Sequence, residues 1–478
     1  MTLIYSGEMN TTVLPKKGEI VPLTIESLAF GGKGISHIGG MVVFVKNAIP
    51  GQLVNARILK KRKTYLEALA HDVINESQLS EEISCTHHKW CGGCTFQNLK
   101  YEEQLKAKQL QVKEIFHRIG RFDDFLIKPI LPSEDVFHYR NKMEFTFSNR
   151  RWITDEDEHL NRDFALGLHV PGRFDKIYNI DQCSLQLEIG NQILNKVKNL
   201  SFSLNLEPYD IREHTGFLRH LVIRCAKETG EVMVNFVTSK EKPERLKPIV
   251  EEITKNYSQV VSIVNNINTK KAGIAMGEWE IILHGKDFIV EKLGNYEFEI
   301  SANSFFQTNT RQGKRLYDVV KDECNLTGNE IVYDLFCGTG SISIYLSEDA
   351  KMVHGFELIN DAVINARQNA IRNNVKNAWF YKGDLMDIFQ NSIEVKDIES
   401  PDVMVIDPPR AGIHKKTIPH IIEKNPERIV YVSCNPSSQA RDIQLLCGGG
   451  YKLMGLQPVD MFPHTPHVEN VATLTKNN

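Results

Sequence analysis

Hydrophobic and polar residues alternate over short stretches in the first part of the chain, and each stretch ends near Gly, Pro or Asn. Four or five such stretches follow one another between residues 11 and 72. Alternation with a period of two predicts β-strands, and short strands in regular succession predict a small antiparallel barrel. We therefore expect an OB-like β-barrel over residues 11–72.

The middle of the chain, residues 73–292, mixes strand patterns with helical ones. The segments KMEFTFSNRRW, HLVIRCAKETGEVMVNFVT and QVVSIVNNINT are rich in β-branched and aromatic residues, which favour strands. We expect an α+β domain with a mainly antiparallel sheet. A charged helical stretch at 101–119 is expected to pack on the last domain.

Strands alternate with helices in the last part, residues 293–478. After the strand in EIVYDLFCGTG, four further strands finish at or next to a polar residue or a cysteine, namely Glu357, Asp384, Asp407 and Cys434. Such alternation predicts an open parallel sheet whose functional groups line its carboxyl edge. The chain is thus expected to be a multidomain α/β protein that ends in a Rossmann-like domain.

Composition and charge narrow the class of protein. The 478 residues are 41% hydrophobic and 24% charged, which excludes collagen-like and wholly disordered chains. No apolar run approaches the roughly 18 residues that cross a bilayer, and the first residues lack an export signal. We therefore expect a cytoplasmic protein with no membrane partner and no obligate protein partner.

Positive charge gathers in the predicted barrel although the whole chain carries −3. Residues 11–71 hold nine Lys and Arg against three Glu, a local pattern typical of nucleic-acid binding. The run Lys60, Lys61, Arg62 and Lys63 is either a set of RNA contacts or a solvated strand end.

Four of the nine cysteines form a possible ligand set. Cys85, Cys91 and Cys94 lie within ten residues, and Cys183 follows at a distance. Tetrathiolate sites hold zinc or an iron–sulfur cluster. The spacing is nearer to that of ferredoxins than to the paired CxxC motifs of zinc ribbons, and it favours the cluster.

A mixed zinc site stays open because His87 and His88 lie between the first two of these cysteines. Nine cysteines in a chain of this length are too few for a disulfide scaffold. Three others have no partner at ligand spacing and are expected to be buried structural thiols: Cys225, Cys324 and Cys447.

The glycines after the first strand of the last domain indicate the kind of cofactor. Gly338-Thr339-Gly340 lacks the third glycine of a dinucleotide fingerprint, since Ser343 stands in its place. Such a turn suits a ligand without phosphates. Glu357 at the second strand end fits a ribose diol and Asp384 an adenine edge, so we expect an S-adenosylmethionine site.

Two motifs bear on the reaction. Asp407-Pro408-Pro409 is similar to the motif of amino-group methyltransferases, but Arg410 stands where those enzymes carry an aromatic residue. Cys434 comes directly after a strand and before a predicted helix, whose N-terminus would lower the pKa of an exposed thiol. Cys434 is therefore a candidate nucleophile.

The chain resembles a known family at several of these motifs. FGGKGISHIGGMVVFVKNAIPGQ resembles the TRAM domain of RNA-modifying enzymes, which implies RNA as its ligand. DLFCGTGSISI, DPPRAG, YVSCNPSSQARDI and HVENVATL resemble the RNA uracil-C5 methyltransferases that use S-adenosylmethionine. The barrel and the four cysteines are similar to the branch acting on 23S ribosomal RNA, the uracil-1939 type, which carries a four-iron four-sulfur cluster.

That resemblance implies that the tRNA branch, the first alternative, lacks the barrel and the cluster. The second alternative is an iron–sulfur sensor that binds RNA without methylating it, and the presence of Cys434 and Glu469 argues against it.

The resemblance also implies residue roles. Cys434 would be the nucleophile and Glu469 the base, already ionised near pH 7, with His467 as a possible helper. The cofactor contacts would be Gln307, Phe336, Gly338, Ser341, Glu357, Asp384 and Asp407.

Weaker RNA-contact candidates lie elsewhere in the chain. Arg140 and Lys142 open a strand and could meet phosphates, although the residues alone favour solvated charge at a strand edge. Phe305 or Phe306 could stack on an extruded base, and core packing is the competing role for both.

Overall fold

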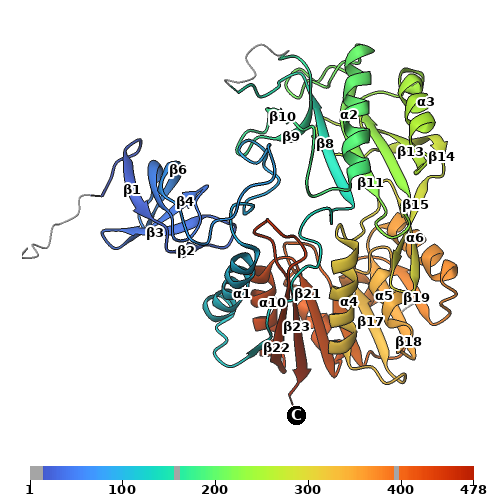
Figure 1. The fold of residues 1–478 in the computed structure, drawn as a ribbon. Coiled ribbons are helices and arrows are strands. Elements are labelled where there is room, and N and C mark those ends of the chain that lie inside the picture. Colours follow the sequence, from blue (N-terminus) through green and yellow to red (C-terminus); the bar gives the residue numbers. More distant parts are fainter. Residues whose placement is uncertain (1–13, 155–161, 392–397, 478) are drawn as a thin grey trace, which may run out of the picture. The chain divides into compact units, whose positions relative to one another are not determined.

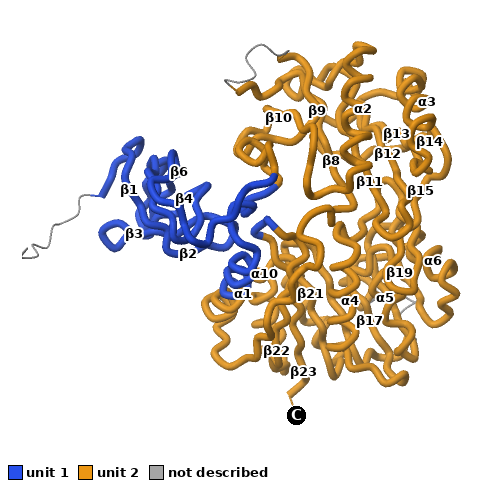
Figure 2. Tube along the Cα trace, in the orientation of Figure 1, with its two compact units in different colours: residues 1–84, 94–111, 464–466 blue, residues 85–93, 112–463, 467–478 orange. Residues whose placement is uncertain are grey.

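The computed structural model describes residues 14–154, 162–391 and 398–477, which form two compact units (Figure 2). Unit 1 comprises the chain up to residue 84 together with residues 94–111 and 464–466. Unit 2 comprises residues 85–93, 112–463 and the remainder. Residues 11–13 of the predicted barrel lie outside the described residues, and Figure 1 traces the elements along the chain.

Unit 1 contains a six-stranded, barrel-like sheet in the order β1-β5-β6-β4-β3-β2. Its strands are β1 (Ile20–Thr24), β2 (Ser27–Leu28), β3 (Gly34–Ile38), β4 (Met41–Lys46), β5 (Leu53–Lys61) and β6 (Tyr65–Asn75). Every neighbouring pair is antiparallel except β4 and β6. Alternate residues such as Val43, Val45, Val54, Ala56 and Ile58 are buried in one core, as the period of two predicts. The expected barrel is confirmed.

A seven-stranded sheet forms the first part of unit 2, in the order β10-β9-β8-β11-β12-β13-β14. Its strands are β8 (Lys142–Ser148), β9 (Ala165–His169), β10 (Ile177–Asn179), β11 (Leu218–Cys225), β12 (Val232–Thr238), β13 (Val260–Ile267) and β14 (Trp279–Gly285). Only β12 and β13 are parallel neighbours, so the expected antiparallel sheet is confirmed. Helices α2 (Glu188–Ser203) and α3 (Lys247–Asn256) share one hydrophobic core with it, to which Phe145, Leu221, Ile193 and Ile253 contribute.

An eight-stranded sheet forms the last part, in the order β19-β18-β17-β20-β21-β23-β22-β7. Its strands are β7 (Leu126–Ile127), β17 (Ile331–Leu335), β18 (Met352–Glu357), β19 (Ala378–Lys382), β20 (Val403–Ile406), β21 (Arg428–Ser433), β22 (Tyr451–Val459) and β23 (Glu469–Lys476). The five strands β17 to β21 are parallel, and β23 then pairs antiparallel with β21. This is the predicted Rossmann-like sheet.

Further helices and a two-stranded hairpin lie between these strands along the chain. They are α1 (Tyr101–Arg118), the hairpin β15 (Phe288–Leu293) and β16 (Tyr296–Ser301), α4 (Thr310–Cys324), α5 (Ser341–Leu346), α6 (Asn360–Arg372), α7 (Leu385–Asn391), α9 (Ile418–Lys424) and α10 (Pro436–Gly448). The last turns of α1 belong to unit 2, where the following strand β7 extends the eight-stranded sheet beside β22. None of the described helices is long and apolar enough to cross a membrane.

Candidate active site

The turn between β17 and α5 leaves room for a ligand at its backbone. Phe336, Gly338 and Gly340 all adopt positive φ, at 66°, 54° and 79°. A Cβ on Gly340 would lie 2.8 Å from the ring of Phe380, so that glycine is required by packing. A Cβ on Gly338 would meet nothing within 4 Å. The turn is therefore tightly packed at Gly340 and open at Gly338, where a ligand can approach the backbone.

Glu357, the last residue of β18, is fixed beside this turn. One of its carboxylate oxygens accepts a hydrogen bond from the Gly338 amide at 3.1 Å, and the other accepts from the Ile359 amide at 2.8 Å. Each oxygen keeps further acceptor capacity. The carboxylate is thus held in one orientation and can still receive the hydroxyls of a diol.

Behind the turn lies a buried polar group that the sequence did not single out. Asp334 is fully buried and accepts from the Ser343 hydroxyl at 2.6 Å, while its Oδ1 has no hydrogen-bond partner among the described residues. Burial raises the pKa of Asp334 to about 7. The serine that replaces the third glycine thus has a structural reason, because it satisfies one oxygen of this carboxyl.

Tyr317 is a hydrogen-bond neighbour of two predicted cofactor contacts, Ser341 and Gln307. The hydroxyls of Tyr317 and Ser341 lie 2.8 Å apart, and the buried Gln307 side chain is a further hydrogen-bond neighbour of Tyr317. Asp384 is exposed, and its carboxylate accepts from the Met386 amide at 2.8 Å at the start of α7. Asp384 therefore caps a helix, a role that the sequence analysis did not predict.

Strand register brings Cys434 and Glu469 together. Ser433 at the end of β21 lies opposite Asn470 in the antiparallel β23, so the next positions along the two strands are Cys434 and Glu469. Asp407 follows the neighbouring strand β20, and its charge acts on both groups. A thiol and two carboxyls from three strands therefore share one site.

The protonation state of Cys434 differs from the prediction. Cys434 is half-buried rather than exposed, and burial with the charges of Glu469 and Asp407 raises its pKa to about 11. Helix α10 does begin two residues later, with Asn435 capping it through a 3.1 Å bond from the Ser437 amide. Desolvation and two nearby carboxylates outweigh the partial positive charge of that helix end, so the prediction of a lowered pKa is wrong.

Glu469 also holds its proton more tightly than expected. Its side chain is 7% exposed, and burial followed by the charge of Asp407 raises its pKa to about 8. The pKa of Asp407 itself is raised by burial to about 7. The expectation of a carboxylate already ionised near pH 7 is therefore wrong for Glu469 in the free protein.

Arg410 is the site residue that the sequence analysis undervalued. Its positive charge lowers the pKa of both Cys434 and Glu469, against the larger effect of burial. The Arg410 carbonyl accepts from Asn435 at 3.0 Å and from the Ser438 hydroxyl at 3.1 Å, which ties this loop to the start of α10. The departure from the amino-methyltransferase motif at this position was the available signal.

The two adjacent phenylalanines have different environments. Phe306 is 4% exposed and its ring centroid lies 5.8 Å from that of Phe298, so it is a core residue. Phe305 is 67% exposed. Its loop is held by the buried Arg224, whose guanidinium donates to the carbonyls of Ala302 and Ser304. Of these two residues, Phe305 is the one whose ring is exposed.

The weaker candidates for RNA contacts also differ in their exposure and in the partners that they already have. Lys142 pairs with Glu144 at 2.5 Å, and burial lowers the pKa of Lys142. Glu144 therefore already neutralises part of the positive charge of Lys142. Arg140 donates from Nε to the Lys142 carbonyl at 3.0 Å. All four residues of the run 60–63 are exposed, and Lys60 lies 3.9 Å from Glu67.

Three of the four candidate thiols belong to unit 2. Burial raises the pKa of Cys91 to about 12, and the charges of Cys183 and Cys85 add to this effect, so the three thiols act on one another electrostatically. His87 accepts through Nε2 from the Asp181 amide at 3.2 Å, which links the first two cysteines to the segment of Cys183. Cys94 belongs to unit 1. Within the described residues, no group of three or more His, Cys, Asp or Glu side chains is placed to hold a single metal ion.

Cys225 and Cys324 are buried, as expected. Cys447 is half-buried, so the prediction of a buried thiol is wrong at that position. The ninth, Cys337, is buried beside the glycine turn.

Two family models match the chain. The TRAM domain matches residues 15–70, and the family described as tRNA (Uracil-5-)-methyltransferase matches residues 229–477. An uncharacterised RNA methyltransferase of Chlorobaculum tepidum is 39% identical over 96% of this chain and 96% of its own length. One from Bacteroides thetaiotaomicron is 39% identical over 94% of this chain and 99% of its own. These relatives do not support the alternative of an RNA-binding sensor without methyl transfer.

A solved structure is similar to nearly the whole chain. The Pyrococcus abyssi tRNA (uracil-54, C5)-methyltransferase in complex with S-adenosyl-L-homocysteine superposes with a TM-score of 0.72 and 29% identity, over 95% of this chain and 100% of that chain. The barrel therefore does not by itself exclude a tRNA substrate, contrary to the prediction. Family models, relatives and fold agree: the chain belongs to the RNA uracil-C5 methyltransferases, which depend on S-adenosylmethionine, and it carries a TRAM domain.

Proposed function

We propose that this enzyme methylates C5 of a uridine in 23S ribosomal RNA in the cytoplasm, with Cys434 as nucleophile and Glu469 as base. The observation that carries the catalytic assignment is the register of β21 and β23, which sets the two side chains at neighbouring positions on the edge of the sheet. Their mutual electrostatic effect supports it.

The chemistry explains why a thiol and a carboxyl are needed. C5 of uracil is a weak nucleophile until the Cys434 thiolate adds to C6, which forms an S–C6 bond and moves the ring electrons toward C5 and O4. Bound S-adenosylmethionine supplies the methyl group. Glu469 then accepts the C5 proton, the C5–C6 double bond forms again, and the S–C6 bond breaks to return the thiolate.

The proposed cofactor contacts are Gln307, Phe336, Gly338, Ser341, Glu357, Asp384 and Asp407. The open space at Gly338 and the fixed carboxylate of Glu357 support a ligand whose ribose meets this strand end. The carboxyls of Asp334 and Asp407 make the surroundings acidic, which suits a cofactor that carries a positive sulfur.

We further propose that Cys85, Cys91, Cys94 and Cys183 hold a four-iron four-sulfur cluster. Close thiols that repel one another as thiolates are stabilised by a cationic centre, and a cluster binds them at separate corners rather than around one ion. His87 uses Nε2 on backbone amides, which argues against it as a zinc ligand. The cluster would serve structure or RNA binding, because methyl transfer needs no electron.

Anaerobic purification tests the cluster directly. The protein should be brown and contain about four irons per chain, and Cys183→Ser should lose the iron while Cys225→Ser, a buried thiol outside the set, should keep it. Stoichiometric zinc without iron would contradict the cluster.

A tRNA uracil is the second candidate substrate, favoured by the overall similarity to the Pyrococcus abyssi enzyme. Transfer of labelled methyl groups to unmodified 23S rRNA and tRNA transcripts, each supplied alone, separates the two. We expect 5-methyluridine in the 23S transcript, and methylation of the tRNA alone would overturn the ribosomal assignment.

A further inference from the structure

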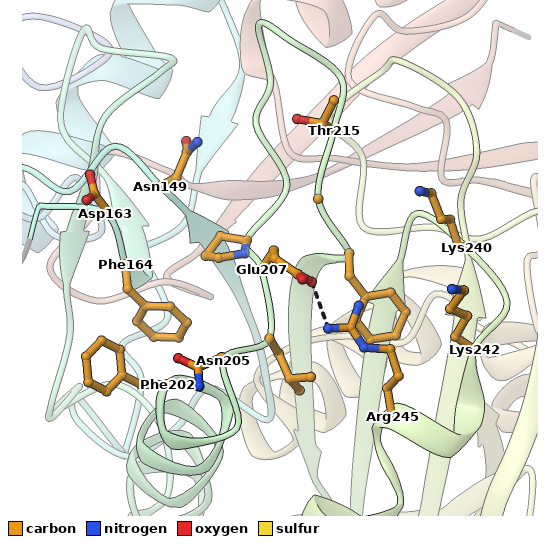
Figure 3. A pocket seen from close by; sticks show the side chains of 14 residues that line it. Asn149, Asp163, Phe164, Phe202, Asn205, Glu207, Thr215, Lys240, Lys242 and Arg245 are labelled. Carbon is orange, nitrogen blue, oxygen red and sulfur yellow. Dashed lines mark hydrogen bonds and ion pairs between the residues drawn. The ribbon is translucent and has the colours of Figure 1, made fainter.

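A cavity separate from the candidate active site lies in unit 2, at the end of the seven-stranded sheet where β8 ends and β11 begins. Its volume is about 700 Å³, within the usual range of ligand sites. Residues on its wall include Asn149, Phe164, Phe202, Lys240, Lys242 and Arg245 (Figure 3). None of these residues belongs to the active site described above.

One side of the cavity is aromatic. Phe202 stands at the end of α2 and is 51% exposed, although phenylalanine normally avoids water. The ring of Phe164, itself 9% exposed, packs edge to face against it with the centroids 5.5 Å apart. Figure 3 shows the two rings together on one side of the cavity. They offer a supported apolar surface to a planar ring.

The other side is basic. Lys240 and Lys242 follow β12, are exposed, and make no salt bridge within the described residues. Arg245 is already engaged, since it pairs with Glu207 at 2.8 Å and stacks over Phe217 at 4.7 Å from the ring centroid. The hydrogen bond from Arg245, together with its charge, lowers the pKa of Glu207. Two lysines thus remain for an anionic ligand.

We propose that this cavity binds a nucleotide of the substrate RNA outside the catalytic centre, with the base on Phe202 and a phosphate near Lys240 and Lys242. An aromatic surface with adjacent positive charge is the combination that holds single-stranded nucleic acid without base-specific contacts. The proposal rests on RNA being the substrate and not on which RNA is methylated.

The length of β8 gives the distance between the cavity and the proposed cofactor contact Gln307. Asn141, just before β8, donates to the Gln307 carbonyl at 2.9 Å, whereas Asn149 lies just after β8 on the cavity wall. At about 3.3 Å per residue the two ends are about 25 Å apart. A stacked strand rising about 3.4 Å per nucleotide needs about seven nucleotides to join them.

Binding of a fluorescent twelve-nucleotide oligouridine to the full-length protein, without cofactor, tests the site. Phe202→Ala should weaken binding about five- to hundredfold, the range for losing one stacked base. The pair Lys240→Ala with Lys242→Ala should weaken it and lower the slope of log K against log salt by up to about 1.4. A four-nucleotide oligouridine with 4-thiouridine should cross-link to the peptide around Phe202 in the wild-type protein.

Matched controls come from the same unit. Phe174 is 69% exposed and lies outside the cavity wall, and Lys247 and Lys255 lie on α3. Their alanine variants should bind as the wild type does. Unchanged binding in both cavity variants, equal losses in the controls, or tighter binding of free uridine monophosphate than of the oligomer would overturn the proposal. Methyl transfer by Cys434 is not measured here, so failure of this site leaves the catalytic assignment intact.

Discussion

Cys434, Asp407 and Glu469 all hold protons more tightly than their ordinary pKa values predict. Burial is the first cause for each, and like charge adds to it for Cys434 and Glu469. Arg410 opposes both of these shifts. In the free protein near pH 7 the Cys434 thiol is therefore protonated and so is much of Glu469. The proposed mechanism needs both protons removed, so in that mechanism the balance between Arg410 and the carboxyls sets the working pH.

Arg410→Gln should raise the pKa of Cys434 further, because it removes the positive charge that favours the thiolate. Below that pKa, the rate of Cys434 alkylation by iodoacetamide follows the thiolate fraction, and mass spectrometry measures this rate between pH 8 and about 9.5. We expect a slower rate in Arg410→Gln than in the wild type at each pH, because the higher pKa leaves less thiolate. Arg372→Gln, which removes an arginine paired with Glu297 and Glu299 elsewhere, is the control and should be alkylated at the wild-type rate. An unchanged rate in Arg410→Gln would refute this role.

Asp407→Asn should stabilise the protein at high pH. The pKa of Asp407 is raised on folding, so its ionisation is costlier in the folded state, and stability falls as pH rises from about 4 through about 7. Asparagine carries no such charge. Thermal unfolding should give a Tm several degrees above wild type at pH 8 and a smaller difference at pH 4. A Tm gain that is equal at both pH values would contradict the assignment.

At the scale of elements, the local pattern predicted the strands and the polar residues at their ends. It could not decide between Phe305 and Phe306, because Arg224 on β11 holds their loop from another sheet. Nor could it give the pKa directions at Cys434, since desolvation depends on which strands surround the thiol. The period of hydrophobic residues along one segment indicates whether that segment is a strand or a helix. The exposure and the protonation state of a side chain also depend on segments that are distant in the sequence.

The exposed end of β5 gives an element-scale test of RNA binding. The pair Lys60→Ala with Lys61→Ala should weaken RNA binding and lower its salt slope by up to about 1.4, while the rate at saturating RNA stays the same. Lys46→Ala with Arg57→Ala removes two exposed charges from the same sheet further from that end. If both pairs change the slope equally, the run at β5 is a solvated surface without a specific role.

Positive and negative charges are concentrated in different parts of the chain. The barrel segment is basic although the chain carries −3, and the catalytic edge gathers Asp334, Asp407 and Glu469. A basic module attracts the phosphates of RNA, while an acidic centre favours a cationic cofactor. We therefore propose that the basic barrel attracts RNA, while the acidic edge of the last sheet binds the cofactor.

The central claim is that methylation passes through a covalent bond between Cys434 and the uracil ring. Substrate RNA that carries 5-fluorouridine at the target should form a protein–RNA adduct that survives denaturing gels and requires S-adenosylmethionine, because Glu469 can remove a proton from C5 but not fluorine. Glu469→Gln should trap the same kind of adduct on normal RNA. Cys434→Ala should give no adduct and lose more than about a thousandfold in rate, which is about 4 kcal/mol in barrier. Methyl transfer by Cys434→Ala above that level, or an adduct that forms without Cys434, would contradict the account.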